Sequence, residues 1–226
     1  MKRNVDKAQM NLKQKVTRDT IDYSLRNQDQ QPIDLWYQQS YTLILQRFSA
    51  GCEAFPTQMD QWIERKAWVG SWLPTILKGE INQADVALLA ELESKYRTIK
   101  IVDMTTDSLS TFNWEEDIYK FLEASDKILN GNGNGNWHEN VSSTSKLMHF
   151  MCPQLFPIMD AVVCKEIISV KARNNRHRHY FDYFSALIGF LEEDVALKEY
   201  IVKISTEQKV SVLRIIDLVI FSRRTT

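Results

Sequence analysis

Apolar residues recur at the 3.6-residue spacing of an α-helix along most of this chain, and residues that interrupt helices are scarce. The 226 residues include only 7 glycines and 5 prolines. Val86, Leu89 and Leu92, for example, fall on one face of an expected helix. We therefore predict an all-α, multi-helix globular fold with about nine helices.

Capping residues predict where several helices begin. Pro32 is expected to be the first residue of one helix, because its missing N–H costs nothing at that position. Asn82 is expected to cap a second helix, and Thr111 a third. Thr206 is expected to begin the last helix. One short apolar run, residues 99–104, can form a single strand, although no partner strand is evident.

Length and hydrophobic content bound the number of domains. With 44% hydrophobic residues, the chain can bury one good-sized core or two smaller ones that share an interface. We predict an N-terminal helical lobe over residues 1–104 and a C-terminal helical lobe over residues 105–226, with a cleft between them. A single domain is the alternative.

Charge, cysteine use and hydropathy exclude several classes of protein. The formal net charge of −1 does not indicate a polycation that binds nucleic acid through overall charge. The three cysteines, Cys52, Cys152 and Cys164, fit neither a disulfide framework nor a zinc site, so a reducing cytoplasm is expected. No run of 18 apolar residues is present, so no membrane span is predicted. We expect no metal and no cofactor.

Positive charge gathers in two segments of this balanced chain. Residues 1–18 carry six Lys and Arg side chains against one acid. Residues 171–179 contain no acid and hold four more cations, namely Lys171, Arg173, Arg176 and Arg178. Such segments suit phosphate oxygens, although each can equally be a solvated helix or loop.

A glycine-rich run, NGNGNGN at residues 130–136, is predicted to be a loop, because glycine adopts positive φ at little cost. The backbone N–H groups of Gly131, Gly133 and Gly135 can cradle a phosphate. The run lacks the Gly-Lys-Ser/Thr ending of a P-loop, so a flexible connector is the alternative reading.

The residues with the clearest chemistry lie after this loop. The hydroxyls of residues 142–144 are expected to cap a helix that starts near Ser145. Lys146 would then lie in the first turn, where the helix N-terminus disfavours a cation and so favours the neutral, nucleophilic amine. His149 lies one turn further on the same side, either as a core histidine or beside Lys146 in a pocket.

A rigid elbow is predicted next. Pro153 and Pro157 each fix φ and push the preceding residue towards an extended conformation. Asp160 follows at the start of a helix expected over residues 161–171. Its carboxylate either caps this helix, which stabilises by about 1 kcal/mol, or serves a reaction.

The stretch FPIMDAVV, residues 156–163, resembles the segment around the catalytic aspartate of the helix-hairpin-helix DNA glycosylases, especially their adenine-specific branch. Thr-Ser-Lys at residues 144–146 resembles the helix start that carries a lysine in members with lyase activity. The resemblance implies that Asp160 stabilises positive charge on a sugar and that Lys146 is an optional nucleophile. The hairpin consensus and a four-cysteine iron–sulfur loop are absent, and Gly131–Gly135 would stand in place of the hairpin.

We therefore expect a DNA glycosylase-like protein that binds DNA and excises a modified or mismatched base. Trp137 would stack on the flipped base, and His149 would border the pocket. Two alternatives remain open. One is a non-catalytic helical module that binds nucleic acid through the basic loop. The other is a protein-interaction module whose six tryptophans fill the core.

Overall fold

The computed structural model describes residues 2–27, 32–50, 59–72, 77–111, 113–131, 140–171 and 176–222. Within these ranges the protein is all-α, as predicted, with twelve α-helices and no β-strand. None of the helices in this part of the chain is both long enough and apolar enough to span a membrane.

The described helices have the following bounds. In the first half of the chain they are α1 (Lys2–Lys15), α2 (Arg18–Arg26), α3 (Pro32–Ala50), α4 (Met59–Ser71), α5 (Gln83–Tyr96), the 3₁₀-helix η2 (Ile101–Asp103) and α6 (Ser108–Thr111). In the second half they are α7 (Trp114–Asn130), α8 (Val141–Met151), α9 (Ala161–Val163), the π-helix η3 (Cys164–Ile168), α10 (His177–Glu193), α11 (Val195–Gln208) and α12 (Val212–Ser222).

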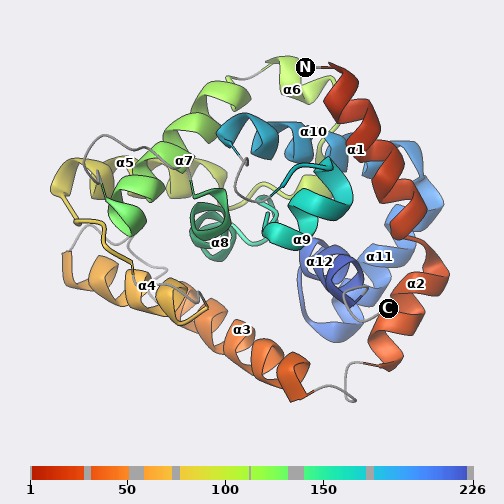
Figure 1. Ribbon diagram of the computed structural model, residues 1–226, viewed down its shortest axis with the longest axis horizontal. Helices are drawn as coiled ribbons and strands as arrows, with labels where there is room; N and C mark the ends of the chain where they lie inside the picture. Colours follow the sequence, from red (N-terminus) through yellow and green to blue (C-terminus); the bar gives the residue numbers. More distant parts are fainter. Residues whose placement is uncertain are drawn as a thin grey trace.

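Helix α8 occupies the middle of the molecule (Figure 1). Helix α7 packs on one side of it, and α3 and α4 pack on another. Helix α12 lies against α2, α9 and α11, and α1 runs along α10 and η3. The central position of α8 explains why nearly all of its side chains are buried.

The buried apolar side chains form one cluster that extends from Ala8 to Ile220. Aromatic residues occupy much of its centre, where Phe156 contacts the rings of Tyr96, Phe121 and Phe184 at centroid distances of 5.2–6.0 Å. The elbow bounded by Pro153 and Pro157 is therefore anchored in the core through Phe156. The division of the chain near residue 104 stays a prediction.

The basic N-terminal segment is largely a docked helix. Lys13 forms an ion pair with Glu193 at 2.5 Å, and Lys15 forms one with Glu166 at 2.7 Å. Asn11 donates a 2.6 Å hydrogen bond to the carbonyl oxygen of Ile167. Part of the positive charge of residues 1–18 is thus balanced within the molecule.

Two of the predicted helix starts are confirmed. Pro32 is the first residue of α3, and Asn82 caps α5 by accepting a 2.9 Å hydrogen bond from the backbone N–H of Asp85. Thr111, by contrast, ends α6, and Asn113 precedes α7. At both confirmed helix starts, the type of the residue in the first turn or at the N-cap was sufficient to predict where the helix begins.

Two other predictions are wrong. Residues 99–104 contain the 3₁₀-helix η2 and no strand, because the backbone N–H of Ile101 bonds to the carbonyl oxygen of Gln154 at 2.9 Å in place of a strand partner. Thr206 lies inside α11, and the last helix begins after Ser211. The Ser211 hydroxyl accepts a 3.1 Å hydrogen bond from the N–H of Arg214, which makes it the true cap.

Candidate functional site

Helix α8 begins at Val141, one turn before the start near Ser145 that the hydroxyls of residues 142–144 predicted. Asn140 is the N-cap, and its side chain accepts a hydrogen bond from the N–H of Ser143 at 3.3 Å. The hydroxyls of Ser143 and Thr144 bond back to the carbonyl oxygen of Asn140 at 3.0 and 3.1 Å instead. The predicted start near Ser145 is therefore wrong, and Lys146 lies beyond the first turn.

Burial, and not the helix terminus, sets the environment of Lys146. Its Nζ donates a 3.3 Å hydrogen bond to the carbonyl oxygen of Trp72. Desolvation of the partly buried ammonium lowers the pKa of Lys146, while the negative charges of Asp160 and Asp217 oppose that change. The amine is consequently easier to deprotonate than that of an exposed lysine.

Asp160 caps α9, as the residue pattern allowed. Its Oδ1 accepts hydrogen bonds from the N–H groups of Val162 at 2.8 Å and Val163 at 3.0 Å. Helix α9 passes into the π-helix η3, which ends at Ile168 and is followed by Ser169 with a left-handed φ of 61°. The helix predicted over residues 161–171 is thus shorter and partly π-helical. These two hydrogen bonds from backbone N–H groups fix the orientation of the Asp160 carboxylate.

Side chains from two helices hold the elbow in place. The backbone N–H of Met159 donates a 3.0 Å hydrogen bond to Oγ of Ser145 on α8. The hydroxyl of Tyr180 on α10 donates a 3.0 Å hydrogen bond to the carbonyl oxygen of Pro157. These contacts place the elbow alongside the segment of α8 that carries Lys146.

His149 is buried, and both of its ring nitrogens are engaged. Nδ1–H donates to the carbonyl oxygen of Phe156 at 2.7 Å, and Nε2 accepts from the hydroxyl of Tyr41 at 2.7 Å. Burial lowers the pKa of His149 to about 4, so the ring is neutral and this tautomer follows from the two partners. The geometry gives His149 a structural role between α3 and the elbow.

Two charged residues of α12 that were not predicted from the sequence join the site. Nη1 of Arg214 lies 2.6 Å from Oδ2 of Asp217. The guanidinium of Arg214 lies over the ring of Tyr41 at 4.6 Å and over that of Trp72 at 5.8 Å. The only signal in the sequence is a charged pair three residues apart within an otherwise apolar helix.

Lys146, Asp160, Arg214 and Asp217 form what we call the charged cluster. Burial raises the pKa of Asp217, the nearby charge of Arg214 lowers it, and the charge of Asp160 raises it. Burial and the charges of both carboxylates also raise the pKa of Tyr183. Lysine, arginine and two carboxylates thus influence one another at buried or partly buried positions. No metal-binding group of three or more His, Cys, Asp or Glu side chains occurs in the described part of the chain.

Residues 80–224, more than half of the chain, match DUF6308, a family of unknown function. The chain belongs to the DUF6308 family. All four members of the charged cluster lie within the matched segment, whereas Tyr41 and Trp72 precede it. No curated protein and no solved structure matches this DUF6308 member.

The predicted phosphate loop is described only at its first glycine. In this DUF6308 member, Gly131 follows α7 with a φ of 76°, and its N–H donates to the carbonyl oxygens of Asp126 and Lys127 at 3.2 and 3.1 Å. Gly131 therefore ends a helix in the manner typical of glycine. Three other predicted site residues lie outside the described residues: Gly133, Gly135 and Trp137.

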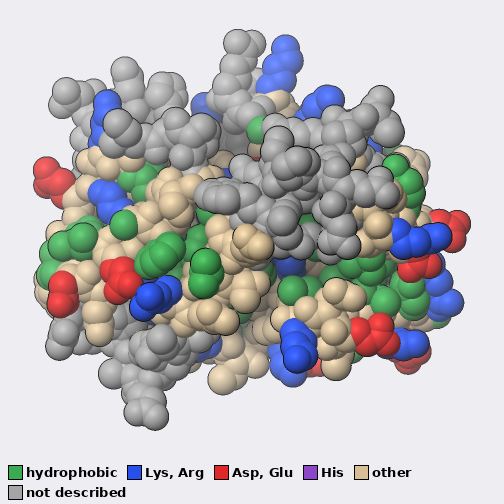
Figure 2. All heavy atoms as spheres, turned by 90° about the horizontal axis from the view of Figure 1, so that it is seen from below, with side chains coloured by type: hydrophobic (Ala, Val, Ile, Leu, Met, Phe, Trp, Pro, Cys, Tyr) green, Lys and Arg blue, Asp and Glu red, His purple; other side chains and the backbone are tan. Residues whose placement is uncertain are grey.

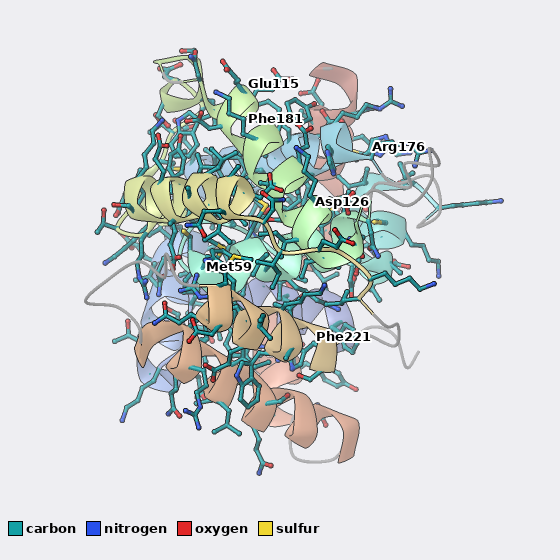
Figure 3. The ribbon with its side chains drawn as sticks, turned by 90° about the vertical axis from the view of Figure 1, so that its left-hand side faces the viewer. Met59, Glu115, Asp126, Arg176, Phe181 and Phe221 are labelled. Carbon is teal, nitrogen blue, oxygen red and sulfur yellow. The ribbon has the colours of Figure 1, made fainter. Side chains whose placement is uncertain are left out.

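The predicted basic loop is in part the start of α10. Lys171 and Arg178 are exposed, and Arg176 precedes the helix, where its backbone N–H donates to Nδ1 of His179 at 3.1 Å. Arg173 lies outside the described residues. The first turn of α10 contains no acid, and Figure 3 shows Arg176 beside the thin grey trace at the edge of the molecule. On the face that Figure 2 shows, the coloured Lys and Arg side chains are interspersed with Asp and Glu.

Proposed function

We propose that this protein is a DNA glycosylase-like enzyme that cleaves the N-glycosidic bond of a modified or mismatched base. One observation carries the proposal: the 3.0 Å hydrogen bond from Met159 to Ser145 joins the positions next to Asp160 and Lys146, and burial lowers the pKa of the Lys146 amine. Asp160 and Lys146 are the pair of residues that the resemblance to helix-hairpin-helix glycosylases assigns to catalysis.

The chemistry follows from the two groups. The neutral amine of Lys146 attacks C1′ of the sugar as the base departs, and the carboxylate of Asp160 stabilises the positive charge that develops on the sugar. The N–H groups of Val162 and Val163 hold that carboxylate in one orientation, so no reorganisation is needed during the reaction. The departing base takes up the proton that the amine loses on attack, and ring opening passes the second amine proton to the ring oxygen, which leaves an imine between Nζ and C1′.

Borohydride trapping tests this proposal directly. Duplexes that each carry one damaged base, one mismatch or one abasic site are incubated with the protein and borohydride, which reduces an imine to a stable protein–DNA adduct. We expect an adduct with the wild-type protein and none with Lys146→Ala. Lys165→Ala is the matched control, because the Lys165 side chain is 82% exposed, and this variant should keep the adduct.

Asp160→Asn separates binding from chemistry. The amide keeps an oxygen for the two backbone N–H groups but removes the negative charge, so we expect duplex binding to remain and base release to fall by about 10²–10³-fold. An enzyme that neither releases a base nor forms an adduct on any of these duplexes would contradict the proposal.

A nucleic-acid-binding module without chemistry is the second candidate. It is favoured by the exposed Lys171 and Arg178 and by the lack of acids in the first turn of α10. Duplex affinity should then fall with salt, survive Asp160→Asn, and weaken when Lys171, Arg176 and Arg178 are changed together to Ala. Lys203→Ala, at an exposed position on α11, is the control expected to bind normally.

A further inference from the structure

Helix α12 brings a second carboxylate to the surroundings of the Lys146 amine. Trp72 links the two sides of the charged cluster: its carbonyl oxygen accepts the hydrogen bond from Lys146 at 3.3 Å, and its ring faces the guanidinium of Arg214. Arg214 in turn holds Asp217 at 2.6 Å. Because α12 also packs against α9, Asp217 and Asp160 lie on neighbouring elements.

The two carboxylates have different surroundings. Asp160 accepts two backbone hydrogen bonds at the start of α9, which fix the orientation of its carboxylate. Asp217 has a side chain that is only 15% exposed and is held by one arginine nitrogen. Burial raises the pKa of Asp217. Carboxylates with contrasting environments in one site are suited to different tasks, one as a fixed charge and the other as a proton carrier.

We propose that Asp217 is the acid–base catalyst for the amine of Lys146, and that Arg214 positions it. The inference rests on the proposed function, because it concerns the abasic substrate, on which Lys146 forms an imine with the aldehyde carbon C1′ of the opened sugar. The structure assigns the two carboxylates separate roles: Asp160 as the fixed negative charge and Asp217 as the group that exchanges protons with the reacting nitrogen and oxygen.

The proton balance of the step closes within the site. In the proposed step, the Asp217 carboxylate takes one proton from the Lys146 ammonium. The neutral amine attacks the aldehyde carbon; a C–N bond forms, and the carbonyl oxygen takes a proton from the nitrogen. Asp217 then returns its proton to the new hydroxyl, which leaves as water while the nitrogen lone pair forms the C=N bond. Asp217 is again a carboxylate, and the iminium carries the charge of the original ammonium.

The other titratable groups around the cluster do not compete for this proton. Burial raises the pKa of Tyr41 to about 12 and raises that of Tyr183 as well, so both phenols stay protonated near neutral pH. His149 has both ring nitrogens occupied by Phe156 and Tyr41. Arg214 remains a cation. The two carboxylates remain as acceptors for the lysine proton, and of these Asp160 is already engaged by the N–H groups of Val162 and Val163.

Reductive alkylation with a small aldehyde tests Asp217 without any nucleic acid. Glycolaldehyde and cyanoborohydride alkylate lysines through the same imine, and peptide mass spectrometry reads the rate at each lysine from pH 5 to pH 10. In Asp217→Asn, which keeps an oxygen for Arg214, we expect Lys146 to react about 10²-fold more slowly at pH 7. The exposed Lys165 reports on the same sample and should not change.

The opposite result overturns the inference. If Asp217 acts only as a nearby charge, its removal lowers the pKa of Lys146 further, and the amine reacts at an equal or higher rate at pH 7. Should Asp217→Asn fail to fold, the variant Arg214→Lys tests the same inference. It keeps the positive charge but loses the planar guanidinium that orients Asp217. We expect alkylation of Lys146 to be about tenfold slower in this variant. A wild-type rate in that variant contradicts the positioning role.

Failure of the inference and failure of the proposed function give different results. If glycolaldehyde alkylates Lys146 in an Asp217-dependent manner but no abasic duplex is trapped, the glycosylase proposal is wrong and the role of Asp217 stands. If the duplex is trapped at the same rate by the wild-type protein and Asp217→Asn, the glycosylase proposal stands and Asp217 is not the catalyst.

Discussion

Ser145 accepts a 3.0 Å hydrogen bond from the backbone N–H of Met159 through its Oγ. Each of these residues precedes one of the two candidate catalytic residues, Lys146 and Asp160. The bond therefore joins α8 to the elbow at the point where the two functional side chains leave the backbone. Both partners are fully buried, so water cannot replace the bond when it is broken.

Ser145→Ala is expected to destabilise the protein. The Met159 N–H would be left buried without an acceptor, which costs about 1–3 kcal/mol in free energy of unfolding. Urea denaturation measures this loss. Ser142→Ala on the same helix is the control, because Ser142 is partly exposed and alanine is the better helix former. Equal stability of the two variants would show that the bond to Met159 contributes nothing.

A buried ion pair between α4 and α5 should be among the most sensitive positions in the chain. Arg65 donates to both oxygens of the fully buried Glu93 at 2.7 and 3.2 Å, and Arg97 donates to one of them at 3.0 Å. Glu93→Gln leaves buried guanidinium charge without its counter-ion, so we expect a loss of roughly 3–5 kcal/mol in free energy of unfolding. Glu207→Gln, which removes an exposed partner of Lys203, should leave the denaturation midpoint unchanged.

Gly79 lies so close to the end of α7 that no side chain fits. A Cβ at this position would lie 2.3 Å from the carbonyl oxygen of Ile128 and 2.4 Å from that of Lys127. Gly79→Ala must shift backbone and should cost roughly 1–3 kcal/mol. Gly70→Ala in α4 is the matched control, because its Cβ meets only the flexible Leu77 side chain at 3.3 Å and alanine favours the helix by about 1 kcal/mol. Thermal denaturation should show a lower midpoint than that of the wild-type protein only for Gly79→Ala.

Local features of the sequence predicted the fold class and some of the helix boundaries. Helical spacing of apolar residues depends only on neighbours within a few turns, and the caps at Pro32 and Asn82 act within one turn. Residues 142–144 offer three hydroxyls with the same capping chemistry as Asn140, so residue type alone does not single out Asn140. Which residue caps depends on backbone angles that the sequence does not state.

The charged cluster was only half predictable. Lys146 and Asp160 flank a proline-bounded turn, which is a local signal. Arg214 and Asp217 form a pair three residues apart, a pattern that occurs on many solvated helices. Only the packing of α12 against α9, together with the contact between Arg214 and Tyr41, makes that pair buried and places it in the site. Such long-range packing has no signature in the sequence of α12.

The neutral state of His149 should make stability depend on pH. Its pKa in the folded protein is lowered by burial from 6.5 to about 4, so the unfolded chain binds more protons than the folded one between these values. The stabilisation is complete above pH 6.5 and is lost as the pH falls towards 4. The difference amounts to roughly 3 kcal/mol in free energy of unfolding. Urea denaturation from pH 4 to pH 8 should show this loss in the wild-type protein and a smaller loss in His149→Gln, which cannot be protonated. Identical pH profiles for the two proteins would mean that His149 is protonated equally in the folded and unfolded states.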